Sequence, residues 1–123
     1  MPNLSTLDSD RYRVGHMIDF CEKILRFYRE ADLDGEHPSE MRILALLRLF
    51  ETLGEAASKV SKETKTIHPE IPWLDASDTR NRFIHGYHDL DYSVLWLTIQ
   101  DDIPSLLEQL YQLRSELESR YGH

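Results

Sequence analysis

Apolar residues recur along most of the chain at steps of three and four, the spacing of one face of an α-helix. The first run predicts a helix that begins near Asp8 or Ser9 and ends near Ala31. A second run predicts a helix from Ser39 to about Lys62, and its apolar positions are too many for a single stripe. We therefore expect this second helix to be buried on more than one side, either centrally in the domain or against another subunit.

The stretch between residues 64 and 78 is rich in residues that break helices. Pro69 and Pro72 predict a connector with at most a turn or two of helix, and Trp73 within it is expected to cover the core. The candidate N-caps for the helix that follows are Asp75, Ser77 and Asp78. We expect that helix to end near His85, because Gly86 is a favoured helix stop.

The last helix is predicted to follow a turn at residues 89–91, which offers acidic caps, and Pro104 should kink it or divide it in two. The sequence has no sustained strand alternation, no internal repeat and no Gly-rich phosphate loop. We therefore predict an all-α fold, an up-and-down bundle of four to five helices forming one domain over residues 1–123. Residues 1–8 and 118–123 are expected to be flexible tails.

Composition limits the class of protein. No run approaches the ~18 apolar residues of a membrane span, and the N-terminus has neither the basic start nor the apolar run of a signal peptide, so a cytoplasmic location is expected. The one cysteine, Cys21, lies among apolar positions and is predicted to be a packed core thiol, rather than a reactive or metal-binding one. The net charge of −8 is unlike that of proteins that grip nucleic acid broadly, so any RNA contact must be local.

The stretch from Thr79 to His88 carries the densest set of groups for chemistry in the chain. Its hydrogen-bonding and titratable residues are Arg80, Asn81, Arg82, His85, Tyr87 and His88. Histidine exchanges a proton near neutral pH, and the planar fork of arginine fits a phosphate. An acid or base beside a phosphate clamp is what cleavage of a phosphodiester requires.

Helical geometry limits which of these groups can act together. On a straight helix one face would carry Asn81, Arg82, His85 and His88. Arg80 falls on the next face and would not meet His85. If the helix ends at His85, the helix dipole stabilises the imidazolium, which suits a general acid.

The spacing Arg80, four residues, His85, one residue, Tyr87 resembles the Arg-x4-His-x-Tyr motif of HEPN-domain proteins. Within them it is most similar to the HepT-like toxins that pair with a minimal nucleotidyltransferase antitoxin. The resemblance covers roughly residues 10–113. Its further blocks are Arg48 with Gly54-Glu55-Ala56, Pro69 to Trp73, Trp96, and Asp102 to Leu106.

This resemblance implies a metal-independent endoribonuclease toxin of a type VII toxin-antitoxin system, with no cofactor. His85 would be the general base or acid when a 2′-hydroxyl attacks the adjacent phosphorus, Arg80 would stabilise the phosphorane, and Asn81 would orient the phosphate or the imidazole. It further implies that Tyr87 accepts AMP groups from the antitoxin, and that the site is composite, at the two-fold interface of a homodimer. The expected partners are RNA, the antitoxin and a second copy of the chain.

Several residues keep alternative interpretations. Arg82, His88 and Arg48 are candidates for positioning the substrate, although Arg48 can instead pair with Glu51 or Glu55 on its own helix. A metal site formed by His85, His88, Asp89 and Asp91 is disfavoured, because Gly86 interrupts the helix and no second ligand pair of recognised spacing appears. For the whole chain, the alternative function is a non-catalytic helical subunit that binds a nucleotide or a protein as the partner of a nucleotidyltransferase.

Overall fold

The structure is a computed structural model and describes residues 4–33, 39–84 and 90–121 of the chain. Within these ranges the side chains of residues 4, 31–33, 74–77, 80 and 120–121 are not described. The described part is helical, apart from its connectors and one isolated antiparallel bridge, which confirms the predicted all-α class.

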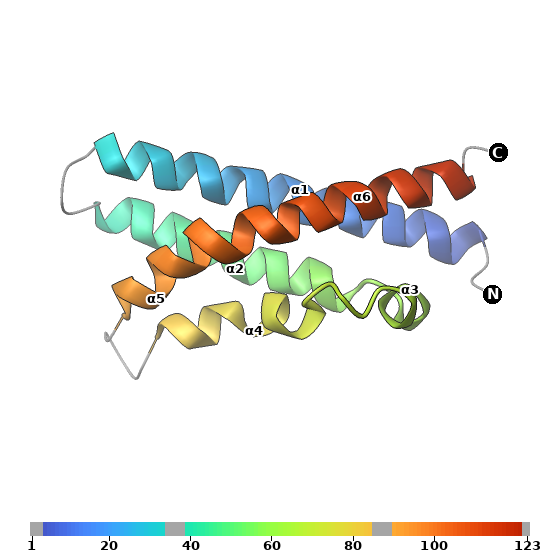
Figure 1. Cartoon of the computed structure of the whole chain (residues 1–123). Helices are drawn as coiled ribbons and strands as arrows, with labels where there is room; N and C mark the ends of the chain where they lie inside the picture. Colours follow the sequence, from blue (N-terminus) through green and yellow to red (C-terminus); the bar gives the residue numbers. More distant parts are fainter. Residues whose placement is uncertain (1–3, 34–38, 85–89, 122–123) are drawn as a thin grey trace.

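The first two helices form a long antiparallel pair (Figure 1). Helix α1 spans Leu4–Leu33 and so begins earlier than the predicted caps at Asp8 or Ser9. Helix α2 spans Glu40–Ser58, and Ser39 caps it by accepting a hydrogen bond from the backbone N–H of Arg42 at 3.2 Å. The Arg42 guanidinium also reaches Glu30 of α1 at 3.0 Å, which ties the two helices together near their connection.

Helix α2 is shorter than predicted, because the chain turns at Lys59, whose N–H donates to the Ala56 and Ala57 carbonyls. A separate short helix, α3, then spans Lys62–Ile67. Helix α4, which carries Arg80, spans Trp73–Phe83. It begins directly after Pro72 with no side-chain cap, so the predicted caps at Asp75, Ser77 and Asp78 are wrong.

The last helical stretch is divided, as expected near Pro104. Helix α5 spans Tyr92–Leu97 and is capped by Asp91, whose side chain accepts from the N–H of Val94 at 3.1 Å. A π-helical turn, η1, spans Thr98–Asp102, and helix α6 spans Ile103–Tyr121. Proline cannot donate the hydrogen bond of a regular α-helix, and the wider turn ends at Asp102, two residues before Pro104. Helix α6 also extends beyond Leu117, past the predicted end.

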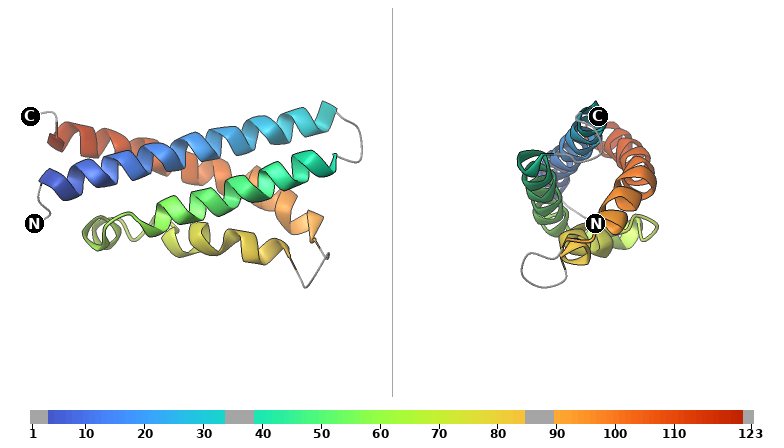
Figure 2. Two further views of the ribbon diagram at one scale, coloured as in Figure 1. Left: turned by 180° about the vertical axis from the view of Figure 1, so that it is seen from behind. Right: turned by 90° about the vertical axis from the view of Figure 1, so that its left-hand side faces the viewer.

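The four long helical segments form a ring around a common core. Helix α1 packs against α2 and α6, α2 packs against α4, and α4 packs against α5. The right-hand view of Figure 2 shows this ring end on, and Figure 1 shows α3 at the end of the bundle where α1 begins. The prediction that α2 is buried on more than one side is confirmed by its contacts with both α1 and α4.

The core is built by apolar residues at the predicted helical spacing. Buried positions include Val14, Met17, Ile18 and Ile24 of α1, Leu46, Phe50 and Leu53 of α2, and Leu95, Ile99, Leu106, Leu110, Leu113 and Leu117 of the last stretch. Trp73 packs against this core, as predicted. No helix in the described ranges is both long and apolar enough to cross a bilayer.

Cys21 is fully buried, which confirms it as a core residue. Burial, and to a smaller extent the neighbouring Glu22 carboxylate, raises the pKa of the Cys21 thiol to about 12. The thiolate is the reactive form, so this cysteine is chemically inert in the folded protein.

A buried carboxylate joins the start of α1 to the start of α3. Asp10 of α1 is 1% exposed and accepts three hydrogen bonds from around the start of α3. The Ser61 N–H donates at 2.8 Å, the Ser61 hydroxyl at 2.5 Å and the Thr64 hydroxyl at 2.5 Å. Asp10 therefore holds α3 and the connector that follows it against the bundle.

Candidate active site on helix α4

Helix α4 is held at its start by a cluster of contacts to the connector. The indole N–H of Trp73 donates to the His68 carbonyl at 3.0 Å. The Lys65 ammonium lies 5.9 Å from the centre of the Trp73 ring. The first residue of the helix is thus fixed to the end of α3, which sets where every later residue of α4 lies.

The connector is in turn tied to α6 through His68. Its Nδ1 lies 3.1 Å from Glu70 Oε1, and its Nε2 lies 2.8 Å from Glu116 Oε2. Both contacts are hydrogen bonds only when both ring nitrogens carry protons. A hydrogen bond from its own backbone and then the one from His68 lower the pKa of Glu70. No sequence pattern singles out this histidine, because its carboxylate partner Glu116 lies far away in the chain, on α6.

The far end of α4 is anchored by packing and by backbone pairing. Phe83 is fully buried, and its ring centre lies 4.9 Å from that of Phe50 on α2. Ile84 is extended and forms the isolated antiparallel bridge with Leu90, while the Asp91 N–H donates to the Phe83 carbonyl at 2.6 Å. These contacts bring the residues on either side of segment 85–89 together.

This pairing corrects the predicted end of the motif helix. The helix ends at Phe83, two residues before His85, because Ile84 adopts an extended conformation to meet Leu90. Helix α4 therefore carries Asn81 and Arg82 but does not extend to residue 85, so the predicted helical face shared with His85 is wrong. The last residue of α4 is Phe83, so the predicted stabilisation of an imidazolium by the helix dipole at its last residue does not apply to His85.

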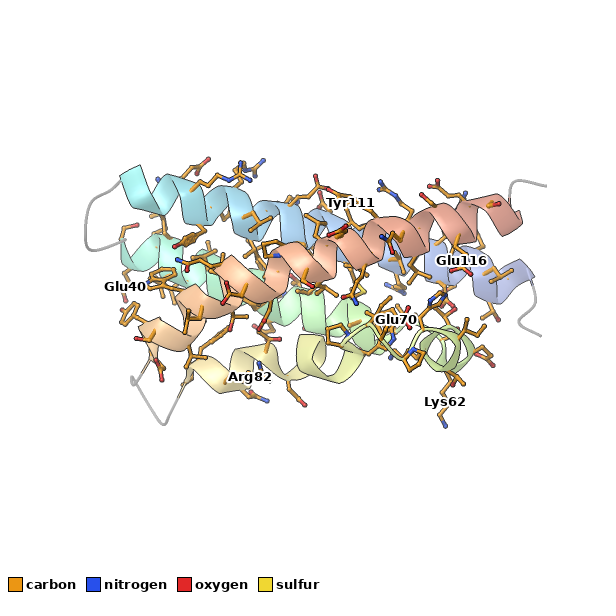
Figure 3. All side chains as sticks on the ribbon, viewed as in Figure 1. Glu40, Lys62, Glu70, Arg82, Tyr111 and Glu116 are labelled. Atoms are coloured by element: carbon orange, nitrogen blue, oxygen red, sulfur yellow. The ribbon has the colours of Figure 1, made fainter. Side chains whose placement is uncertain are left out.

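The described part of the site contains only some of the predicted residues. Asn81 and Arg82 are exposed on α4, where Figure 3 shows Arg82 pointing away from the bundle. The backbone of Arg80 lies in α4, but its side chain is outside the described residues. The predicted roles of His85, Tyr87 and His88, and the stop at Gly86, fall on segment 85–89, which also lies outside them.

Arg48 belongs to the surface of α2. Its guanidinium lies 3.5 Å from the Glu51 carboxylate and 3.9 Å from that of Glu55. Both pairings are those the sequence predicted, and the Arg48 side chain is 63% exposed. These contacts favour a surface ion-pair role for Arg48 over one in positioning a substrate.

No group of three or more potential metal ligands occurs among the residues that the structure describes. What α4 presents there is a cation and an amide on a firmly anchored helix, with Arg80 directly before them in the chain. Such groups bind a phosphate by hydrogen bonds and charge, without a metal.

Comparison with known proteins adds independent information. Residues 17–113 match the model of the family described as ribonuclease HepT-like. The chain is 37% identical over 93 residues to a Thermococcus cleftensis protein named "Probable ribonuclease HepT", covering 76% of this chain and 84% of that protein. No solved structure matches the chain significantly.

More distant relatives agree in their names. A Methanocaldococcus jannaschii protein named "Putative RNase MJ0125" is 25% identical over 104 residues, covering 85% of this chain and 90% of its own length. A Caldanaerobacter subterraneus protein with the same kind of name is 26% identical over 98 residues, covering 80% and 88% of the two chains.

Proposed function

Because the chain belongs to the HepT-like ribonuclease family, we propose that it is a metal-independent endoribonuclease that uses Arg80 and His85. The observation that carries this proposal is the family match over residues 17–113, which includes the whole Arg-x4-His-x-Tyr motif. The anchoring of α4 at Trp73 and Phe83 supports it, because a catalytic group must be held on a rigid element.

The reaction we propose is an internal transfer at phosphorus. The 2′-oxygen of one ribose bonds to the adjacent phosphorus as its proton leaves, and the bond from phosphorus to the 5′-oxygen breaks as that oxygen takes up a proton. His85 serves as the base or the acid in these transfers. Arg80 stabilises the charge on the phosphorane, and Asn81 orients the phosphate or the imidazole. The products are a 2′,3′-cyclic phosphate and a 5′-hydroxyl.

We propose further that the active form is a homodimer with a composite site. Support comes from apolar side chains that the bundle leaves uncovered: Met41 is 80% exposed and Leu44, one turn later on α2, is 59% exposed. Tyr92 and Leu97 of α5 are 50% and 57% exposed, and α5 lies at the same end of the bundle as the start of α2 (Figures 1 and 2). Exposed apolar side chains that gather on one surface are typical of protein–protein contacts, and a second copy of the chain would bury them.

For regulation, we propose that Tyr87 accepts AMP from a minimal nucleotidyltransferase antitoxin, which makes the chain the toxin of a type VII pair acting in the cytoplasm. The added phosphodiester would repel the RNA phosphate and compete for the Arg80 guanidinium. Tyr87→Phe keeps the ring and removes the acceptor oxygen. It should resist silencing by a competent antitoxin, whereas silencing of this variant without any AMP adduct would indicate occlusion by the partner alone.

The test of the activity is cleavage of RNA by the purified protein in EDTA. Arg80→Ala and His85→Ala should each abolish cleavage while the helical content stays unchanged. Arg114→Ala on α6 and His16→Ala on α1 are matched controls, because they remove the same kinds of side chain from positions outside the motif, and they should keep activity. Cleavage at the parental rate by either motif variant would show that the assignment of Arg80 and His85 is wrong.

A second candidate function is a non-catalytic partner subunit of a nucleotidyltransferase, and the net charge of −8 favours it because an acidic body disfavours broad contact with RNA. The same assay separates the two. A subunit of this kind would leave RNA intact in EDTA and with added divalent metal, yet would co-purify with the nucleotidyltransferase.

A further inference from the structure

A small recess opens between α4, the helix that carries Arg80, and the last helical stretch. Its volume is about 190 Å³. It is lined by Leu53, Pro72, Thr79, Arg82, Thr98, Asp102, Ile103, Ser105, Leu106 and Gln109. Pockets for whole small molecules measure roughly 300 to 1,000 Å³, so this recess suits a fragment such as a single nucleobase.

Two short rows of polar side chains form the walls of the recess. On α4, Thr79 and Arg82 are one turn apart, on either side of Arg80 in the chain. On the last stretch, Asp102, Ser105 and Gln109 follow each other at steps of three and four, along one helical stripe. One wall of the recess therefore carries the Arg82 cation, and the other carries a carboxylate, a hydroxyl and an amide.

The floor of the recess is apolar. Leu53, Ile103 and Leu106 are all nearly fully buried. An inorganic anion gains nothing from such a floor and is repelled by the Asp102 carboxylate. A flat heteroaromatic ring, in contrast, can lay its face on aliphatic carbons while its polar edges meet the walls.

The wall that carries Asp102, Ser105 and Gln109 is held in place by the surrounding fold. The π-helical turn that ends at Asp102 closes with the Ile103 N–H bonded to the Thr98 carbonyl, and the Thr98 hydroxyl donates to the Val94 carbonyl at 2.8 Å. The Gln109 amide donates to the Glu70 carbonyl at 3.1 Å. Single π-helical turns recur at functional sites, and this one sets the direction of Asp102.

Resting on the proposed ribonuclease function, we propose that the recess binds one unstacked guanine base of the RNA strand, next to the cleaved bond. Guanine presents two neighbouring donors, N1–H and the N2 amino group, to the acceptor-only carboxylate of Asp102. Its O6 and N7 acceptors suit a guanidinium, and the exposed Arg82 side chain at the edge of the recess would turn inward to meet them. Because Thr79 and Arg82 flank Arg80, a strand whose phosphate meets Arg80 has a base within reach of the recess.

The test uses RNA strands that differ only in one base beside the mapped cleavage site. The parental protein should cleave the guanine strand about tenfold or more faster than the inosine strand, which lacks the N2 amino group. Asp102→Asn should cleave the two strands equally, because the amide is not an acceptor-only partner. Asp101→Asn changes the same charge on the neighbouring exposed residue, which does not line the recess, and should keep the parental preference.

Binding of 2′-O-methyl strands, which cannot be cleaved by attack of the 2′-oxygen, separates this proposal from the proposed activity. Tighter binding of the guanine strand by the parent, lost in Asp102→Asn and kept in Asp101→Asn, supports the recess even if no RNA is cleaved. Cleavage or binding without a guanine preference, or a preference that survives Asp102→Asn, overturns it. Absence of both cleavage and binding overturns the recess and the ribonuclease together.

Discussion

Replacing Asp10 should destabilise the protein far more than its place near the N-terminus suggests. The Asp10 carboxylate is buried in α1 and accepts hydrogen bonds from the backbone and hydroxyl of Ser61 and from the hydroxyl of Thr64. Asp10→Ala removes the acceptor of all three and leaves the donors in a partly buried space. These donors hold the start of α3, and through it the connector that leads to α4.

The size of the effect follows from the kind of hydrogen bond lost. Hydrogen bonds to a charged group contribute roughly 1.5 to 3 kcal/mol each, and they do not add fully. Allowing for the desolvation that the carboxylate no longer undergoes, we expect Asp10→Ala to cost about 3 to 5 kcal/mol. At roughly 4 °C per kcal/mol for a chain of this size, the midpoint of thermal unfolding should fall by about 15 °C. Asp10→Asn keeps one acceptor oxygen and should cost about half as much.

The measurement is urea and thermal unfolding of the parent and the two Asp10 variants, followed by circular dichroism. Asp8→Asn is the matched control, because the Asp8 carboxylate is exposed and pairs with Arg11 at 3.4 Å, a contact typically contributing about 0.3 to 0.5 kcal/mol. If Asp10→Ala costs no more than this control, the Asp10 carboxylate does not hold α3 against the bundle, and the reasoning from its three hydrogen bonds is refuted.

Four further predictions concern other parts of the chain. Cys21, with its raised pKa of about 12, should not react with an aromatic disulfide reagent at pH 8 until urea unfolds the protein. Phe83→Ala should cost about 3 to 5 kcal/mol in urea unfolding, because it empties a buried aromatic position at the end of α4. Leu44→Asp should give a monomer by light scattering and lose RNA cleavage, whereas Ile67→Asp, at an exposed position of α3, should change neither. Because the folded pKa of Glu70 lies below its ordinary value of 4.5, this carboxylate adds stability above that pH, which is lost as the pH falls through the folded value. Glu70→Gln should therefore lose less stability than the parent on acidification below pH 4.5.

Helical periodicity predicted the class and most of the core, because burial in a bundle follows the spacing of apolar residues. It predicted the ends of helices less well. Val60 is buried although α2 ends at Ser58, so an apolar step does not show that the helix continues. The helix stops because Ser61 caps α3, where its hydroxyl accepts from the Thr64 N–H at 3.2 Å and donates to Asp10.

Two contacts between residues five and six positions apart explain the other differences. Helix α4 ends at Phe83 because Ile84 pairs with Leu90, and it begins at Trp73 because the indole is fixed to the His68 carbonyl. Neither spacing belongs to the i+3 and i+4 steps of a helix, so apolar periodicity does not predict these contacts.

In the candidate site, too, some features could be predicted from the sequence and others depend on how the helices pack. The motif and its family could be recognised from the order of residue types alone, and the surface ion pairs of Arg48 followed from helical spacing. The recess beside α4 could not be predicted, because Arg82 and Asp102 come to line the same recess only when α4 lies beside the last stretch. In the sequence Asp102 is merely part of a family block, whereas in the fold its carboxylate is the acidic group among the described residues that line this recess.

The most direct test of the central claim is cleavage, in EDTA, of an RNA that carries a single 2′-deoxynucleotide on the 5′ side of the mapped bond. The proposed mechanism predicts that the parental protein cuts the all-ribose strand to a 2′,3′-cyclic phosphate and a 5′-hydroxyl, and that the deoxy strand stays intact at that bond. Cleavage of the deoxy strand at the same bond, or loss of all cleavage when EDTA is added, would contradict a metal-independent attack by the 2′-oxygen.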